Sequence, residues 1–173
     1  MITRQFPIAL SIFFAVYIIQ EAVVNQFRFF GGGFSLFLIF SLIWAILSSP
    51  KIAALGGFMA GLLMDLSPSS AGLIGQWTLL MIVACYAVSY LGSGNESLSS
   101  NPLGFTFLTT VTIFFVELFY VITGALLGVA SGDSEQVLIT LVGIFIWSLV
   151  VTPIVLPLFS RLHAFTFNTR SAI

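Results

Sequence analysis

Charged side chains are scarce in this sequence. Only five Lys or Arg and six Asp or Glu occur among 173 residues, so 6% of the chain is charged, against about 25% in a soluble domain. So few charges cannot cover a water-facing surface, which excludes an ordinary soluble domain. The sequence also lacks any cluster of Lys and Arg that could bind nucleic acid.

Cysteine and histidine are almost absent. The one cysteine, Cys85, lies inside an apolar stretch, and the one histidine, His163, lies near the C-terminal end. One cysteine cannot form a disulfide within the chain or provide a cysteine-based metal site. Glycine-rich phosphate loops and the H-E-x-x-H and G-x-S-x-G motifs are also missing. The sequence therefore predicts no metal, no cofactor and no enzymatic activity.

The chain is rich in long apolar runs. Hydrophobic residues make up 59% of it and 19 are Phe. Long apolar runs separated by short polar connectors predict an all-α membrane protein, one integral domain with about six transmembrane helices. The predicted spans cover residues 6–24, 34–47, 52–66, 73–91, 105–129 and 137–159.

Basic residues predict the orientation of these spans. With six spans, Arg4, Lys51, Arg161 and Arg170 fall on one side of the membrane and Arg28 falls on the other. Because cytoplasmic loops carry the excess of Lys and Arg, both termini are expected in the cytoplasm. The sequence thus predicts a multi-pass membrane protein.

Small residues and one acid recur along the third predicted span. Ala53, Gly57, Gly61 and Asp65 stand four residues apart, so they share one face of a helix. In lipid, such a face lets another helix approach to backbone contact. We therefore predict a packing face, either within this fold or for a partner. Pro68, in the turn that follows, ends the helix.

Three acids fall inside or at the edge of predicted spans, namely Glu21, Asp65 and Glu117. Glu21 is expected to be a solvated acid at the membrane interface. Asp65 either organises the turn through Ser67, Ser69 and nearby backbone N–H groups, or contacts a partner or ligand. Glu117 is the most deeply placed, and an ionised acid at that depth is costly. It is either a protonated group bonded to a neighbouring helix or part of a binding site within the membrane.

One polar-and-small face on the fifth predicted span carries Glu117. The face comprises Thr106, Thr110, Glu117, Tyr120, Gly124 and Gly128. Asp65 and Glu117 are also the one conceivable pair of intramembrane catalytic acids, but no supporting motif accompanies them. We therefore favour a non-enzymatic role.

The third span and the turn after it resemble the rod shape-determining protein MreD family. The resemblance is carried by Gly57-Phe58-x-x-Gly61-Leu62-x-x-Asp65-Leu66 and by Ser67-Pro68-Ser69-Ser70-x-Gly72-Leu73-Ile74-Gly75-Gln76. The length, the six-helix layout and Lys51 between spans two and three are similar as well, and residues 76–80 look like the actinobacterial branch. The chain departs from the family at Gly31-Gly32-Gly33, where a proline-containing start to the second span is common.

The resemblance implies a scaffold in cell elongation. Members of this family are non-enzymatic subunits of the peptidoglycan-synthesis machinery that maintains rod shape. They bind the single-span protein MreC and, with it, RodA and a class B penicillin-binding protein, and in many bacteria they are coupled to MreB filaments. On this interpretation, the Ala53–Asp65 face docks the transmembrane helix of MreC.

A second interpretation is a vitamin-transporter subunit. MreD-like folds resemble the substrate-binding S components of energy-coupling-factor transporters, which hold a vitamin-sized ligand in a cavity. S components dock their ATPase module through small-residue faces, and the first span offers only Ala9 and Ala15 for that purpose. A ligand cavity also needs convergent polar groups, and these are sparse at the predicted outer ends.

Overall fold

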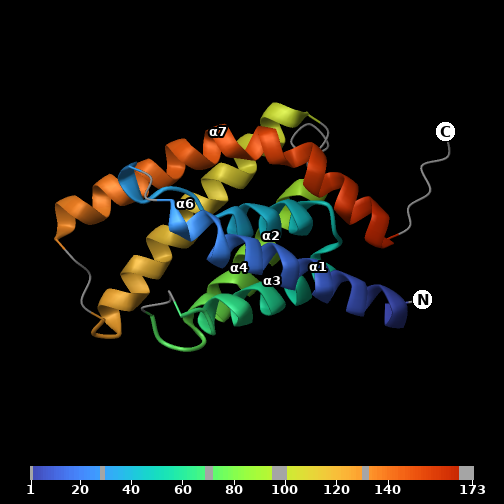
Figure 1. Cartoon of the computed structure of the whole chain (residues 1–173), viewed down its shortest axis with the longest axis horizontal. Helices are drawn as coiled ribbons and strands as arrows, with labels where there is room; N and C mark the ends of the chain where they lie inside the picture. Colours follow the sequence, from blue (N-terminus) through green and yellow to red (C-terminus); the bar gives the residue numbers. More distant parts are fainter. Residues whose placement is uncertain (1, 28–29, 69–71, 95–100, 130–132, 168–173) are drawn as a thin grey trace.

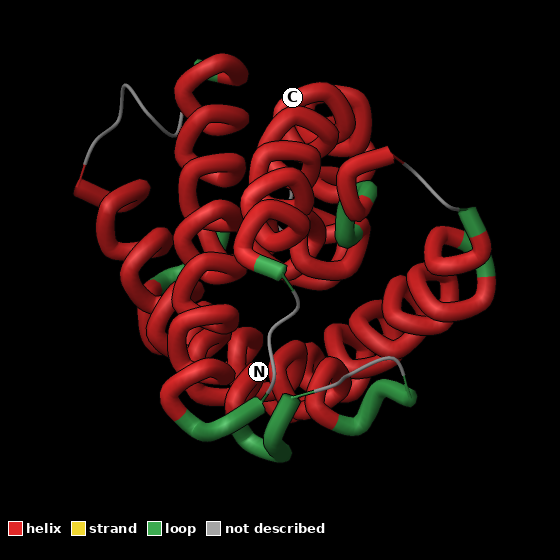
Figure 2. Tube along the Cα trace, turned by 90° about the vertical axis from the view of Figure 1, so that its left-hand side faces the viewer, coloured by secondary structure: helices red, strands yellow, loops and turns green. Residues whose placement is uncertain are grey.

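The structure is a computed structural model in which residues 2–27, 30–68, 72–94, 101–129 and 133–167 are described. These residues are helical apart from short connectors, and no strand occurs among them (Figures 1 and 2). The α-helices are α1 (Ile2–Ala22), α2 (Leu36–Ile46), α3 (Pro50–Asp65), α4 (Gln76–Gly94), α6 (Pro102–Leu126) and α7 (Ser134–Phe167). Two short 3-10 helices, Val24–Gln26 and Phe30–Gly32, connect α1 to α2.

Within the described residues, four segments are long and apolar enough to cross a membrane. They are Pro7–Gln26, Gln76–Gly94, Pro102–Leu126 and Ser134–Phe167. The chain therefore has the architecture of an all-α, multi-pass membrane protein.

The second and third predicted spans are shorter than a bilayer. With 11 and 16 residues, α2 and α3 are about 16 and 24 Å long at about 1.5 Å per residue, against a hydrocarbon core of about 30 Å. The last span was predicted to end at residue 159, but α7 continues to Phe167 and includes Arg161 and His163. Pro153 and Pro157 lie inside α7, which bends over its C-terminal third (Figure 1).

Successive helices run in alternating directions along the long axis of the molecule, and both ends of the chain lie at the same end of it (Figure 1). The connector between α2 and α3 lies at that end too. The C-terminal ends of α1 and α3 and the N-terminal ends of α2 and α4 therefore meet at the opposite end, which we call the distal end.

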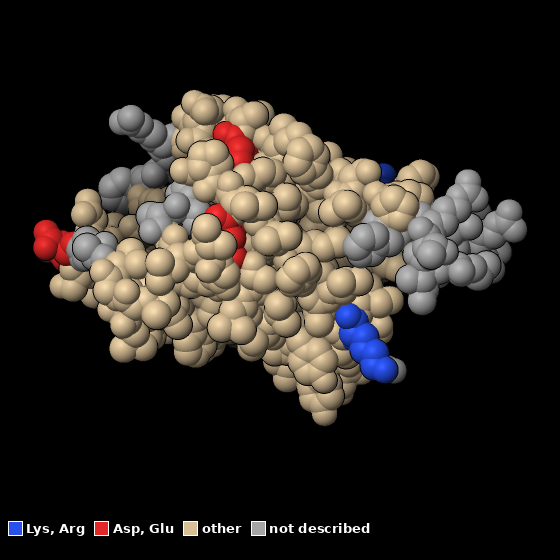
Figure 3. Space-filling view, turned by 90° about the horizontal axis from the view of Figure 1, so that it is seen from below, with Lys and Arg blue, Asp and Glu red and all other residues tan. Residues whose placement is uncertain are grey.

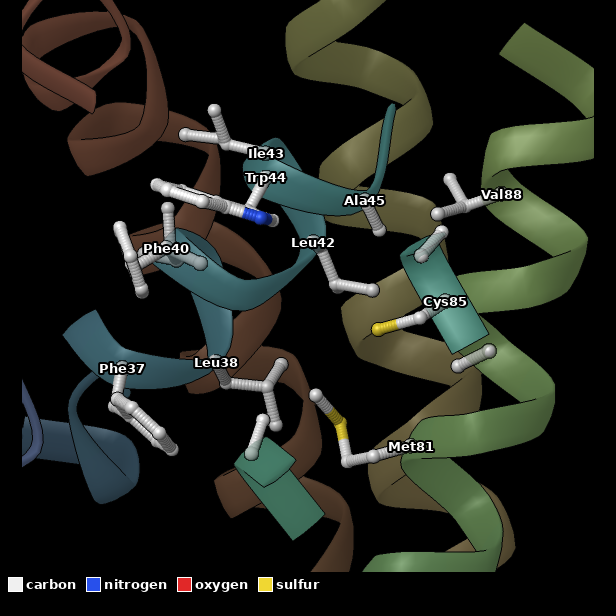
Figure 4. Packing of buried hydrophobic residues seen from close by; sticks show 14 of the residues in the cluster. Phe37, Leu38, Phe40, Leu42, Ile43, Trp44, Ala45, Met81, Cys85 and Val88 are labelled. Atoms are coloured by element: carbon white, nitrogen blue, oxygen red, sulfur yellow. The ribbon is translucent and has the colours of Figure 1, made fainter. Parts of the chain in front are cut away.

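The short helix α2 is the centre of the molecule. Every residue from Phe37 to Ile46 is buried, and α2 contacts α1, α3, α4, α6 and α7. A helix that is apolar all round lies either in a protein core or in lipid, and the contacts of α2 place it in the core. Leu38, Leu42 and Ala45 face the α4 residues Met81, Cys85 and Val88 (Figure 4). The second predicted span is thus a core helix and not a lipid-facing one.

Aromatic rings join α2 to α1 and α7. The Phe13 ring of α1 lies edge-on to Phe40 at 4.9 Å and to Trp44 at 5.4 Å between ring centroids. Phe40 in turn meets Phe159 of α7 at 5.0 Å. Edge-to-face pairs at these distances are favourable beyond the area they bury.

The N-terminus of α2 is held by side chains from two places. Ser35 accepts a hydrogen bond from the Leu38 backbone N–H, and Gln20 of α1 accepts from the N–H groups of Leu36 at 2.7 Å and Phe37 at 3.3 Å. These bonds satisfy donors that a helix start leaves unpaired. In the glycine run before α2, φ is 72° at Gly31 and 85° at Gly32. Residues with a side chain rarely adopt such positive φ values. Gly31 lies against Gly143 of α7.

Truncation of the buried ring of Phe13 is expected to destabilise the protein, whereas the adjacent Phe14 provides a matched control. Phe13 is fully buried and Phe14 is 52% exposed. Phe13→Ala leaves a cavity beside α2, and we expect a loss of about 3 kcal/mol, measured as the free energy of unfolding in detergent micelles. Phe14→Ala should change it by less than about 0.5 kcal/mol. Equal losses would contradict the packing described for α2.

Candidate functional site

The small-residue face of α3 packs against α4. Ala53 is fully buried, and Gly57 and Gly61 lie directly on the backbone of α4. A methyl group on Gly57 would come within 2.9 Å of the Met81 carbonyl carbon, and one on Gly61 within 2.7 Å of the Trp77 carbonyl oxygen. These distances are shorter than any van der Waals contact, so the two helices can approach this closely only because both positions are glycine.

This packing corrects the expectation that the face docks MreC. Gly57, Gly61 and Asp65 contact α4 of the same chain and Ala53 is fully buried, so the Ala53–Asp65 face is not available to the transmembrane helix of a partner. The spacing of small residues identified a contact surface, and the structure shows that the contact is internal.

Asp65 anchors the start of α4. Its carboxylate accepts hydrogen bonds from the backbone N–H groups of Trp77 and Thr78, each at 3.0 Å, and from the Thr78 hydroxyl at 2.5 Å. Asp65 is 8% exposed. The first N–H groups of a helix lack partners within the helix and carry its positive dipole end, so a carboxylate there is favourable.

Two expectations about the acids are revised. Asp65 binds the N-terminus of the next helix instead of organising the turn through Ser67, and Ser69 lies outside the described residues. Glu21 is not merely a solvated acid, because it accepts hydrogen bonds from the Ser67 hydroxyl at 2.6 Å and from the Asn25 amide at 3.1 Å. Glu21 therefore links the end of α1 to the turn after α3.

The turn after α3 also connects α4 to α6. Pro68 is exposed, whereas a methyl group on Gly72 would overlap the Tyr120 hydroxyl. The Gln76 amide nitrogen donates to the Tyr120 carbonyl and to the Thr123 hydroxyl, both at 2.8 Å. The rings of Trp77 and Tyr120 stack with centroids 4.2 Å apart. Gly72 thus leaves room for the aromatic contact between α4 and α6.

A cavity of about 320 Å³ lies at the distal end of the molecule, and we call it the distal cavity. Residues from every described α-helix line it: Tyr17, Gln20, Glu21, Asn25, Gly32, Phe34, Ser35, Phe37, Met64, Ser67, Trp77, Glu117, Tyr120 and Ile144. Sequence reasoning singled out Glu21 and Glu117 but missed Gln20 and Asn25, although both lie where the first apolar run ends.

Glu117 is the one predicted site residue that lines this cavity. Its carboxyl group has no hydrogen bond or ion pair with any residue in the described ranges, so these ranges do not show the predicted bond to a neighbouring helix. Of the other residues on its face, Thr106 bonds to the Pro102 carbonyl of its own helix. The hydroxyl of Thr110 is buried and has no partner among the described residues.

Asp65, Ser48 and His163 are engaged in structural contacts. Asp65 does not line the distal cavity, so that cavity does not bring the two acids together. Ser48 lies 3.0 Å from the Nε2 atom of His163, but its hydroxyl proton is donated to the Trp44 carbonyl at 2.8 Å. The described residues contain no group of three or more metal-ligating side chains.

Comparison of the chain with protein-family models, with curated proteins and with solved structures finds no match in any of the three. The fold and the geometry of the site therefore carry the argument for function.

Replacement of Gly61 tests whether the α3 face is internal. Gly61→Leu places a side chain where the Trp77 carbonyl and the Thr78 backbone lie, and we expect it to lower the free energy of unfolding in micelles by about 3 kcal/mol or more. Gly94 has open space around it, so Gly94→Leu should change stability by less than about 0.5 kcal/mol. A Gly61→Leu protein with normal stability and a weakened partner contact would instead restore the external docking face.

Proposed function

We propose that the chain is an MreD-like, non-enzymatic membrane scaffold of the bacterial elongation complex. In this role it binds MreC and, with MreC, the wall synthase formed by RodA and a class B penicillin-binding protein, and it is coupled through them to MreB filaments. Its contribution to peptidoglycan synthesis is to hold these membrane proteins together.

The observation that carries the proposal is the structural unit formed by the MreD-like motif. Gly57 and Gly61 admit α4, Asp65 binds the first N–H groups of α4, and Gly72 leaves room for Tyr120. The motif residues thus act together to set the geometry of one helical pair. This coherence supports the resemblance to the family.

The proposal includes six membrane crossings with both termini in the cytoplasm. Alternating helix directions and termini at one end of the molecule support an even number of crossings (Figure 1). Lys51 lies at the start of α3 and Arg161 in the C-terminal part of α7, which are both at that end. In Figure 3 the basic and the acidic side chains lie over opposite halves of the visible face. Basic residues on one side favour a cytoplasmic location for it. The short helix α3 would cross where the bilayer is locally thin, and α2 would cross inside the bundle, where the other helices cover it.

A second candidate function, the substrate-binding subunit of a vitamin transporter, is favoured by the distal cavity. On the proposed orientation, this cavity lies in the outer half of the membrane. Its volume of about 320 Å³ is at the lower end of the range for small-molecule sites. More polar residues line this cavity than the sequence predicted for the outer ends of the spans. The scaffold proposal remains first because it accounts for the motif.

Affinity purification of the tagged chain from native membranes distinguishes the two candidates. We expect MreC, RodA and a class B penicillin-binding protein to be enriched over a purification of an unrelated, equally expressed multi-pass protein. The readout is quantitative mass spectrometry of the eluate. Recovery of a transporter ATPase module without MreC or the wall synthase would refute the scaffold and favour the transporter subunit.

A further inference from the structure

Glu117 presents an acid to the distal cavity, and no residue in the described part of the chain bonds to it. It lies on α6, one of the helices of membrane-spanning length. An acid at membrane depth is costly unless it faces protein, water or a partner of opposite charge. The described basic side chains of Lys51 and Arg161 are exposed and belong to the end of the molecule near the termini, so neither supplies that charge.

Three polar side chains of the cavity wall, Gln20, Asn25 and Ser67, are committed to other bonds. The Gln20 oxygen accepts from α2, and the Gln20 amide nitrogen donates to the Asn25 side chain at 2.7 Å. The Ser67 hydroxyl donates to Glu21. The cavity wall is therefore held in place by its own hydrogen bonds, and these donors are not directed at the Glu117 carboxyl group.

Aromatic rings form much of the remaining wall. Tyr17, Phe34, Phe37, Trp77 and Tyr120 line the cavity. The Trp77–Tyr120 stack and the edge-on contact of Tyr17 with Phe37, at 5.6 Å, fix these rings. Ring faces attract organic cations, and aromatic sites are a common means of recognising alkylated ammonium groups. An inorganic cation such as Ca²⁺ would require more oxygen ligands than one free carboxylate.

The side of the cavity at Glu117 adjoins a second space between α6 and α7. Glu117 and Ile144 line both, and Val121, Gln136 and Thr140 also line the second space, whose volume is about 260 Å³. A ligand at Glu117 could therefore come from the aqueous side or from the membrane between these two helices.

We propose that the distal cavity binds a small organic ammonium group, with the Glu117 carboxylate as its counter-charge and the aromatic rings as its walls. The ammonium group belongs either to a free solute or to a lipid headgroup. The inference is independent of the scaffold proposal. If it holds, it also gives the second candidate function, the transporter subunit, a class of ligand.

The test uses the purified full-length chain in an uncharged maltoside detergent. Choline is the free probe, and 3,3-dimethyl-1-butanol is its uncharged counterpart of the same shape. Nanodiscs containing phosphatidylethanolamine or phosphatidylglycerol are the lipid probes. Binding is followed by thermal stabilisation and by tryptophan fluorescence, to which Trp77 in the cavity wall contributes. The variants are Glu117→Gln, Glu117→Asp and, as a control outside the cavity, Glu135→Gln.

We expect saturable binding of choline without binding of the uncharged counterpart. Glu117→Gln should weaken it about tenfold or more, because a hydrogen bond or ion pair to a charged group is lost. Glu117→Asp should retain part of it, and Glu135→Gln should bind as the native chain does. Stabilisation by phosphatidylethanolamine alone, with the same dependence on Glu117, would identify the lipid headgroup as the source.

Three results would overturn the proposal. They are equal binding of the uncharged counterpart, binding that is unchanged in a folded Glu117→Gln protein, and failure of both choline and phosphatidylethanolamine to bind the folded native chain. Co-purification of MreC leaves these results unaffected, so failure of the ligand proposal and failure of the scaffold proposal are separate outcomes.

Discussion

The hydrogen bonds between the Asp65 carboxylate and the start of α4 are the interaction on which the rest of the structure depends. Asp65 ends α3, and the two backbone N–H groups that it binds begin α4. This fixes where α4 starts and how it lies along α3. Only in that register do Gly57 and Gly61 face the α4 backbone. The closely packed pair then forms one wall of the groove that α2 fills.

The membrane environment explains why such a device is needed. Between helices in lipid there is little hydrophobic driving force, so close packing and buried hydrogen bonds decide how they associate. Gly57 and Gly61 allow the close packing, and Asp65 provides the buried hydrogen bonds. The helix α2 has 11 residues and is too short to span a bilayer by itself. The other helices cover it on all sides, so its apolar side chains are buried inside the protein.

Much of the architecture could be predicted from the sequence, because long apolar runs and their breaks are local features. These predicted the all-helical membrane protein and the approximate positions of its four long helices. The spacing of Ala53, Gly57 and Gly61 likewise indicated a close contact. The identity of the covering helix could not be predicted, since spacing describes one surface and not its counterpart.

The remaining differences arise from long-range contacts. The role of Gln20 at the start of α2 depends on two segments 16 positions apart in the sequence meeting at one end of the fold. The distal cavity is formed where several helix ends meet, so no single stretch of sequence indicates it. The predicted last span already contained Pro153 and Pro157 but ended before Arg161, because the apolar run ends there, whereas α7 continues past it to Phe167.

The most direct test of the account is hydrogen–deuterium exchange at the backbone N–H groups of Trp77 and Thr78 in the micelle-embedded chain. With Asp65 in place, both should exchange slowly, although the first N–H groups of a helix ordinarily exchange fast. In Asp65→Ala these two should exchange much faster, whereas replacement of the exposed neighbour by Leu66→Ala should leave them unchanged. Fast exchange at both groups in the native chain, or equal protection in Asp65→Ala, would contradict the central role of this carboxylate.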